Sequence, residues 1–183
     1  MTDTEILEAV AHAKKSCGKC AKFAGALTVE VLRRALEEEG ICVSARDVFI
    51  QGVPTEIDLL VPRADVVAEH GLLYAPEDVL VVLEIKNYGS FGEPTIGKTK
   101  DDFRAIHQRN AQICCAYVTL EERKGYKWAV SDENLGFPTY TLFWHSGSGA
   151  KYTRHPTGDW ERLLRDIKDV IHAKECASAE AIE

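Results

Sequence analysis

The stretch VLVVLEIKN, residues 79–87, decides the fold of this chain. Its β-branched residues predict a strand, and its unbroken apolar start predicts burial on both faces, as in the middle of a sheet. Side chains of a strand alternate between faces, so Glu84 and Lys86 are expected to share one face. Leu80 and Val82 are expected on that same face. An acid and a base at the end of a buried strand need mutual pairing, solvent or a bound metal, because an unpartnered buried charge is strongly unfavourable.

The upstream stretch EIDLLV, residues 56–61, predicts a second strand, which Pro62 ends. Asp58 lies inside it, where a carboxylate is unfavourable. If the two strands pair, Asp58 and Glu84 converge, and two carboxylates held close together repel each other. A divalent cation removes that repulsion, and Mg²⁺ prefers carboxylate, water and phosphate oxygens. With a lysine alongside, this is the equipment for metal-assisted phosphodiester hydrolysis.

Hydrophobic periodicity and turn residues predict the remaining elements. Helices are expected over residues 4–15, 21–39, 99–111 and 158–173, and further strands over 42–50, 113–120 and 139–145. A connection over 62–78 and a glycine-punctuated loop over 87–97 join them, and residues 174–183 are expected to be a frayed tail. The order α-α-β-β-β-α-β-β-α predicts an α/β fold with a central mixed sheet flanked by helices.

Composition limits the classes of protein that this chain can belong to. Its 183 residues and 45% hydrophobic content predict one globular domain over 1–183. The formal net charge of −7 argues against a wide basic surface, so nucleic acid is expected to be contacted locally or with the help of metal ions. No apolar run approaches the ~20 residues of a membrane helix, and the N-terminus lacks a signal-peptide pattern. We therefore expect no membrane contact and a cytoplasmic location.

The six cysteines are expected to be reduced thiols, because no export signal precedes them. Cys17 and Cys20 alone have the spacing of metal ligands, and a structural zinc site would need a second pair. The sequence leaves open whether they bind a metal or are simply two cysteines of a loop.

Asp58 on one apolar strand, followed by Glu84-Ile85-Lys86 closing the next, resembles the PD-(D/E)XK nuclease superfamily. That superfamily includes many restriction endonucleases, Holliday-junction resolvases and nuclease-related domains. The resemblance covers about residues 20–145 and implies a restriction-endonuclease-like core. It departs from the usual motif at Ile57, where proline commonly precedes the aspartate.

The resemblance implies roles for the motif residues. Asp58 and Glu84 bind Mg²⁺, with Mn²⁺ as an alternative, and the backbone carbonyl of Ile85 helps. Lys86 orients or activates the attacking water and stabilises charge in the transition state. A strand-end salt bridge between Lys86 and the two acids is the structural alternative.

Further residues are implied with looser support. Glu30, on the helix over 21–39, holds a second metal or its water, or else pairs with Arg33 or Arg34 on an exposed helix face. Gln108, on the helix over 99–111, stands near the phosphate, or else is a surface residue. A basic segment after the glycine-punctuated loop would form a rim that positions the DNA backbone. The nucleic-acid-binding candidates in it are Lys98, Lys100, Arg104 and Arg109.

The leading functional hypothesis is a Mg²⁺-dependent nuclease acting on DNA. The alternatives are a non-catalytic nucleic-acid-binding module and a protein-interaction domain in which the strand-end charges only pair. Nucleases of this superfamily often act as dimers, so a homodimer is one expectation. The structure of the DNA, its sequence, and the choice between DNA and RNA are left open.

Overall fold

In the computed structural model, the described residues are 5, 6, 8, 9, 11, 12, 21–88, 93–123, 135–146 and 153–180. Five strands form a mixed sheet in the order β2-β4-β5-β6-β7. They are β2 (Leu59–Pro62), β4 (Val79–Tyr88), β5 (Cys114–Arg123), β6 (Thr139–Ser146) and β7 (Thr153–Pro156). The two pairings at the edges, β2 with β4 and β6 with β7, are antiparallel, and the two inner pairings are parallel. A separate two-stranded parallel sheet joins β1 (Phe49–Ile50) to β3 (Leu73–Tyr74), and the short 3-10 helix η1 (Pro76–Asp78) leads into β4.

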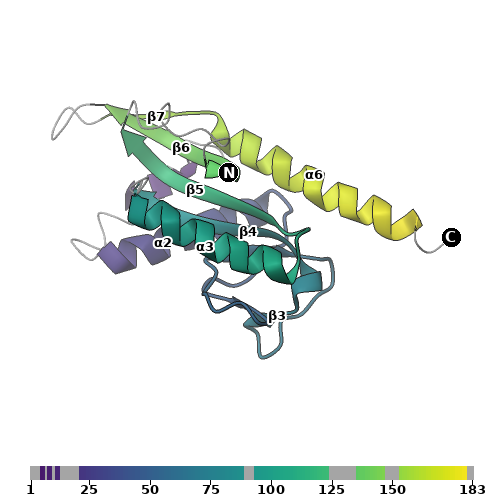
Figure 1. Ribbon diagram of the computed structural model, residues 1–183. Helices are drawn as coiled ribbons and strands as arrows, with labels where there is room; N and C mark the ends of the chain where they lie inside the picture. Colours follow the sequence, from purple (N-terminus) through teal and green to yellow (C-terminus); the bar gives the residue numbers. More distant parts are fainter. Residues whose placement is uncertain are drawn as a thin grey trace.

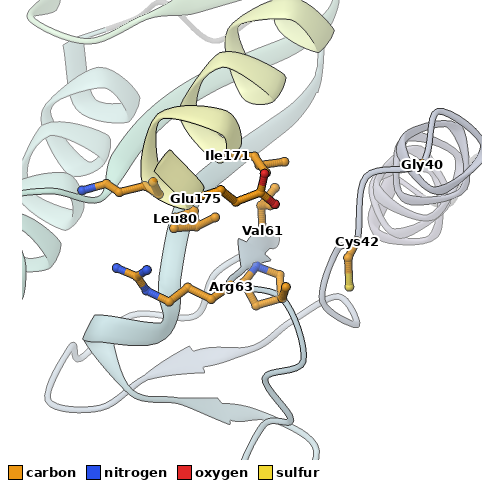
Figure 2. A pocket seen from close by; sticks show the side chains of 10 residues that line it. Gly40, Cys42, Val61, Arg63, Leu80, Ile171 and Glu175 are labelled. Carbon is orange, nitrogen blue, oxygen red and sulfur yellow. The ribbon is translucent and has the colours of Figure 1, made fainter. Parts of the chain in front are cut away.

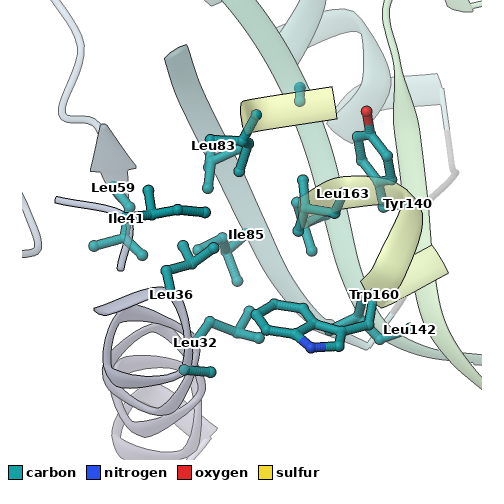
Figure 3. Close-up of a cluster of buried hydrophobic side chains, with 14 of the residues drawn as sticks. Leu32, Leu36, Ile41, Leu59, Leu83, Ile85, Tyr140, Leu142, Trp160 and Leu163 are labelled. Carbon is teal, nitrogen blue, oxygen red and sulfur yellow. The ribbon is translucent and has the colours of Figure 1, made fainter. Parts of the chain in front are cut away.

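Helices cover both faces of the five-stranded sheet (Figure 1). α3 (Glu93–Arg109) packs on one face through Ile96, Phe103 and Ile106. α2 (Ala21–Glu38) and α6 (Asp159–Glu180) both pack on the other. Figure 3 shows the Trp160 indole of α6 extending toward Leu32 of α2 in this second core. The predicted α/β fold with a mixed sheet between helices is confirmed.

The first described long helix, α2, follows its sequence pattern closely. Its buried stripe is Val29, Leu32 and Leu36, and the helix ends at Glu38, one residue before the predicted end at 39. Gly40 adopts a φ of 78° and donates to the Glu37 carbonyl, while Ile41 donates to the Leu36 carbonyl. These two bonds are a Schellman motif, which satisfies the last carbonyls of the helix and needs a left-handed residue.

Two predicted strands are shorter than expected. Of the strand predicted over 42–50, only Phe49–Ile50 forms, and it joins the small sheet instead of the large one. Asp47, with a φ of 59°, interrupts the extended backbone just before it. The strand predicted from residue 56 begins at Leu59, because the carboxylate of Asp58 accepts the N–H of Ile85 in place of a backbone carbonyl.

A β-bulge overturns one prediction about β4. The pairing of β2 with β4 slips between Val61 and Pro62, so Leu80 is an extra residue on β4. A bulge reverses the alternation of side chains beyond it. Leu80 therefore packs on the α2/α6 side and Val82 on the α3 side. The expectation that Leu80 shares a face with Glu84 and Lys86 is wrong.

The helix bounds also differ from expectation. α3 begins at Glu93, six residues early, because Pro94 suits a first helical turn in which its missing N–H is not needed. α6 continues to Glu180, so residues 174–180 of the expected frayed tail are helical. Of the helix predicted over 4–15, the described residues 5, 6, 8, 9, 11 and 12 are helical. Strand β7 was not predicted at all.

Candidate active site

The structure brings Asp58, Glu84 and Lys86 together at one end of the sheet. In the antiparallel ladder Leu59 pairs with Leu83, which sets Asp58 opposite Glu84. Leu60 and Val82 pack in the core beneath α3. Because side chains alternate along a strand, the three candidate residues lie on this same α3 face.

The contacts within the cluster are direct. The Lys86 ammonium donates a hydrogen bond to Glu84 Oε1 and lies 3.9 Å from Asp58 Oδ2. Asp58 Oδ2 also accepts a hydrogen bond of 2.7 Å from the backbone N–H of Ile85. The side chains of Asp58, Glu84 and Lys86 are 24%, 18% and 31% exposed. The cluster is therefore mostly buried but retains access to solvent.

The surroundings make Asp58 a weak acid. Burial, followed by the negative charge of Glu84, raises the pKa of Asp58 to about 6. The hydrogen bond from Ile85 and the charge of Lys86 oppose this rise without cancelling it. The ionised form of Asp58 is thus disfavoured, because a second carboxylate lies close by and solvent is largely excluded.

Two further acids influence the cluster, and sequence reasoning missed both. Asp47, in the turn before β1, adds to the rise in the pKa of Asp58. Burial lowers the pKa of Lys86, but the charges of Glu84, Asp58 and Asp102 outweigh it, so that pKa lies above its ordinary value. Asp102 lies three residues after buried Thr99 and four before buried Ile106, a helical spacing that turns it toward the sheet. That spacing is the signal that would have found it.

Glu30 lies in an ion-pair network on α2. Its carboxylate accepts from Arg33 Nε at 2.8 Å and from Arg34 Nε at 2.9 Å. The Arg33 hydrogen bond, with help from Arg34 and against partial burial, lowers the pKa of Glu30 to about 2. This is the geometry of the salt-bridge alternative, and none of the contacts recorded for Glu30 joins it to Asp58, Glu84 or Lys86.

Gln108 lies at the far end of α3 from the cluster. The neighbouring Arg109 donates to the Gly52 carbonyl at 2.8 Å, and Asn110 donates to the Pro76 carbonyl just before η1. This end of α3 therefore lies near the beginning of β4, whereas Lys86 lies near its end. Gln108 is exposed there.

The four basic residues predicted to bind DNA lie on or at the end of α3 and differ in their surroundings. Lys98 lies 3.8 Å from Asp102, and Arg104 donates to Asp101 at 2.6 Å, so both are neutralised in part within the helix. Lys100 is half-buried, and Arg109 shares the far end with Gln108. The predicted pair of Cys17 and Cys20 lies outside the described residues.

The two carboxylates of the cluster suit a hard divalent cation that takes only one or two of its ligands from the protein. Within the described ranges, no group of three or more His, Cys, Asp or Glu side chains is arranged to hold a metal. Asp58 and Glu84 offer two carboxylates, and Mg²⁺ is commonly held by one or two carboxylates together with water and phosphate oxygens. The raised pKa of Asp58 also fits, because a cation between the two acids would relieve the repulsion that raises it.

The fold is restriction-endonuclease-like. Solved structures of NucC share it. The cAAA-bound form from P. aeruginosa ATCC27853 superposes with a TM-score of 0.62 and 11% identity, over 92% of this chain and 88% of that one. The cAAA-bound form from E. coli MS115-1 gives 0.63 and 12%, over 92% and 87%, and its apo form gives 0.52 and 11%, over 94% and 98%. Likeness at such identities shows the fold alone.

By sequence, neither a protein-family profile nor a curated protein matches this chain. None of the helices in the described ranges combines the length and hydrophobicity needed to cross a bilayer.

Proposed function

We propose that this chain is a divalent-metal-dependent nuclease that hydrolyses phosphodiester bonds of DNA. The observation that carries the proposal is the convergence of Asp58, Glu84 and Lys86 at the end of β2 and β4 in a restriction-endonuclease-like fold. Two acids and an ammonium group in contact are the chemical components that metal-assisted phosphate hydrolysis requires.

Asp58 and Glu84 would hold Mg²⁺ or Mn²⁺, with the backbone carbonyl of Ile85 as a further oxygen donor. When bound, such an ion polarises a phosphate oxygen and lowers the pKa of a bound water. The Ile85 N–H fixes the orientation of the Asp58 carboxylate, so one ligand is held in place before any ion arrives. The partial burial of both acids lowers the local dielectric and strengthens their attraction for a cation.

Lys86 would exchange one partner for another during the reaction. In this structure its ammonium is bound by Glu84 and lies beside Asp58. A cation between the acids would take over their neutralisation and leave the ammonium to face the attacking water or the scissile phosphate. Its raised pKa keeps it charged at neutral pH, so it would stabilise negative charge there and would not act as a base.

Cleavage of plasmid DNA with Mg²⁺ or Mn²⁺ in excess of the protein tests the proposal. We expect Lys86→Ala and Asp58→Ala to lower the cleavage rate by about 100-fold or more, a loss typical of removing a transition-state contact. Lys168→Ala is the matched control, because that lysine forms an exposed pair with Glu39 on the α2/α6 side. Equal cleavage by Lys86→Ala and Lys168→Ala would remove the proposed site.

The non-catalytic alternatives draw on one observation, the ion pairing of Lys86 with both acids. If these charges only pair, Mg²⁺ should not bind, and Glu84→Gln should lower the melting temperature of the metal-free protein. Calorimetric titration with Mg²⁺ distinguishes the nuclease from the non-catalytic alternatives. If the site is that of a nuclease, the unmodified chain binds Mg²⁺ and Glu84→Gln abolishes this binding.

Other expectations remain predictions. Catalytic parts for Glu30 and Gln108, and DNA contacts for Lys98, Lys100, Arg104 and Arg109, await tests by substitution. A homodimer and a cytoplasmic location are likewise predictions; sedimentation analysis would decide the first.

A further inference from the structure

A cavity of about 500 Å³ lies at the opposite end of β2 and β4 from the candidate active site. Its apolar wall is formed by Val61, Leu80 and Ile171, which come from β2, β4 and α6 (Figure 2). Val61 and Leu80 are themselves almost fully buried, so the floor of the cavity is continuous with the core. A volume of this size is in the range of small-molecule sites.

Arg63 gives the cavity a fixed positive charge. Its backbone N–H donates to the Asp78 carbonyl at 2.8 Å and its side-chain Nε donates to the Glu77 carbonyl at 2.7 Å. These bonds hold the guanidinium in place and leave its two terminal nitrogens available. Within the described part of the chain, no acidic side chain pairs with Arg63. A pre-positioned guanidinium without a carboxylate partner suits a planar anion.

A second cation lies at the same corner. Lys174 of α6 also lines the cavity, and its ammonium donates to Gln112 Oε1 at 2.7 Å. Gln112 is bound through its backbone to Asn110, which in turn donates to the Pro76 carbonyl next to Glu77. This series of contacts ties Lys174 to the corner that holds Arg63.

The one acid of the lining points elsewhere. Figure 2 shows the Glu175 carboxylate and the Arg63 guanidinium pointing away from each other. The cavity therefore combines an aliphatic wall, a cationic corner and an acid on the other side. None of the described residues that line it is aromatic, which disfavours the stacking of a planar ring system.

We propose that this cavity binds a small monoanion with an aliphatic body, whose anionic head lies on Arg63 with Lys174 nearby. The apolar body would cover Val61, Leu80 and Ile171 and remove them further from water. The proposal does not depend on the nuclease reaction, because none of its residues belongs to the Asp58 cluster.

Isothermal titration calorimetry with octanoate tests it, with 1-octanol as the neutral probe of equal length. We expect saturable 1:1 binding of octanoate that weakens at least about tenfold in Arg63→Met, as loss of a charge-assisted contact predicts. Ile171→Trp fills the cavity and should abolish binding, whereas Glu175→Gln removes a repulsive charge and should tighten it. Thermal melts of each variant report folding.

Arg63 also donates to the Glu77 carbonyl just before β4, so Arg63→Met can unfold the protein. In that case Ile171→Trp and Glu175→Gln decide whether the proposal holds. Binding lost in folded Ile171→Trp and tightened in Glu175→Gln supports the proposal. No saturable binding of octanoate to the unmodified chain, octanol binding as tightly as octanoate, or unchanged affinity in Ile171→Trp overturns it.

Discussion

At the scale of single residues, Asp58 is the residue of the candidate site that lowers the stability of the fold when it is ionised. Its pKa of about 6 lies above the ordinary 3.8, so the folded chain takes up its proton more readily than the unfolded chain does. Ionised Asp58 therefore destabilises the fold at pH values above 6, and this destabilisation disappears as the pH falls below about 4. We predict that metal-free Asp58→Asn is more stable than the unmodified chain at pH 8, by on the order of 2 kcal/mol.

Most of the difference should be lost near pH 4, where Asp58 is protonated in the folded chain and about half protonated in the unfolded chain. An asparagine oxygen can still accept the Ile85 N–H, so the variant removes the charge and keeps the backbone contact. Urea unfolding in EDTA at the two pH values measures it. Glu77→Gln is the control, because it removes one carboxylate charge from an exposed position near the other end of β4. A stability difference that is equal at pH 4 and pH 8 would contradict the prediction.

The three central residues of the site could be predicted because their signals are local. The alternation of a strand places Glu84 with Lys86, and a charged residue inside EIDLLV marks Asp58. Asp47 and Asp102 could not be predicted, since they reach the cluster only after a turn and a helix have packed. The placement of Glu30 likewise depends on how α2 lies on the sheet, which its own sequence does not encode.

At the scale of the helix, two glycines of opposite situation belong to α2 and its end: Gly25 lies within the helix, and Gly40 lies just after its last residue. Gly40 has a φ of 78°, whereas Gly25 lies in the helix interior, and an added Cβ meets nothing within 4 Å at either position. Backbone conformation alone therefore decides the effect of substitution. We predict that Gly40→Ala lowers the unfolding free energy by about 1 kcal/mol and that Gly25→Ala raises it by about 0.5–1 kcal/mol. Thermal or urea unfolding of both variants checks this, and effects of the same sign would refute the assignment of the helix end.

At the scale of the strand, β7 is held by a contact that crosses its neighbour. Arg154 of β7 donates to Glu121 of β5 at 2.6 Å, passing over β6. The Glu121 side chain is 4% exposed and that of Arg154 is 28% exposed. Losing the arginine leaves a buried carboxylate, whereas losing the acid leaves a cation that can reach water. We predict that Arg154→Met destabilises by about 3 kcal/mol and Glu121→Gln by about 1 kcal/mol.

Urea unfolding of the two variants and of the double variant measures this asymmetry. The double variant should recover part of the loss caused by Arg154→Met. If Glu121→Gln were the more damaging change, the carboxylate would not be the group whose burial matters.

The same strand shows why some elements escape prediction. β4 and β6 are found from long apolar runs, but β7 has four partly exposed residues with no apolar alternation. It is extended because it pairs with the edge of β6 and because its Arg154 forms an ion pair with Glu121. The small sheet of β1 and β3 is similar, with two residues on each strand. Local patterns predict elements that stabilise themselves by burial, and they miss those that depend on a partner.

Across the whole molecule, the sheet separates two places of possible ligand chemistry. The candidate active site lies at the end of β4 that carries Glu84, and the cavity lies at the end that carries Leu80. Four residues of strand span roughly 13 Å, at about 3.3 Å per residue. Beyond about 10 Å, sites that share no contacts behave independently.

We therefore predict that Asp58→Asn and Ile171→Trp have additive effects on the unfolding free energy. The double variant should match the two single changes taken together to within about 0.5 kcal/mol at pH 8. Urea unfolding of the unmodified chain, the two single variants and the double variant measures this. The combination of Asp47→Asn with Asp58→Asn is the control pair and is expected to be non-additive, because the charge of Asp47 acts on Asp58 directly. A coupling above about 1 kcal/mol between the distant pair would mean that β4 transmits strain from one end to the other, and the two sites would have to be treated as one system.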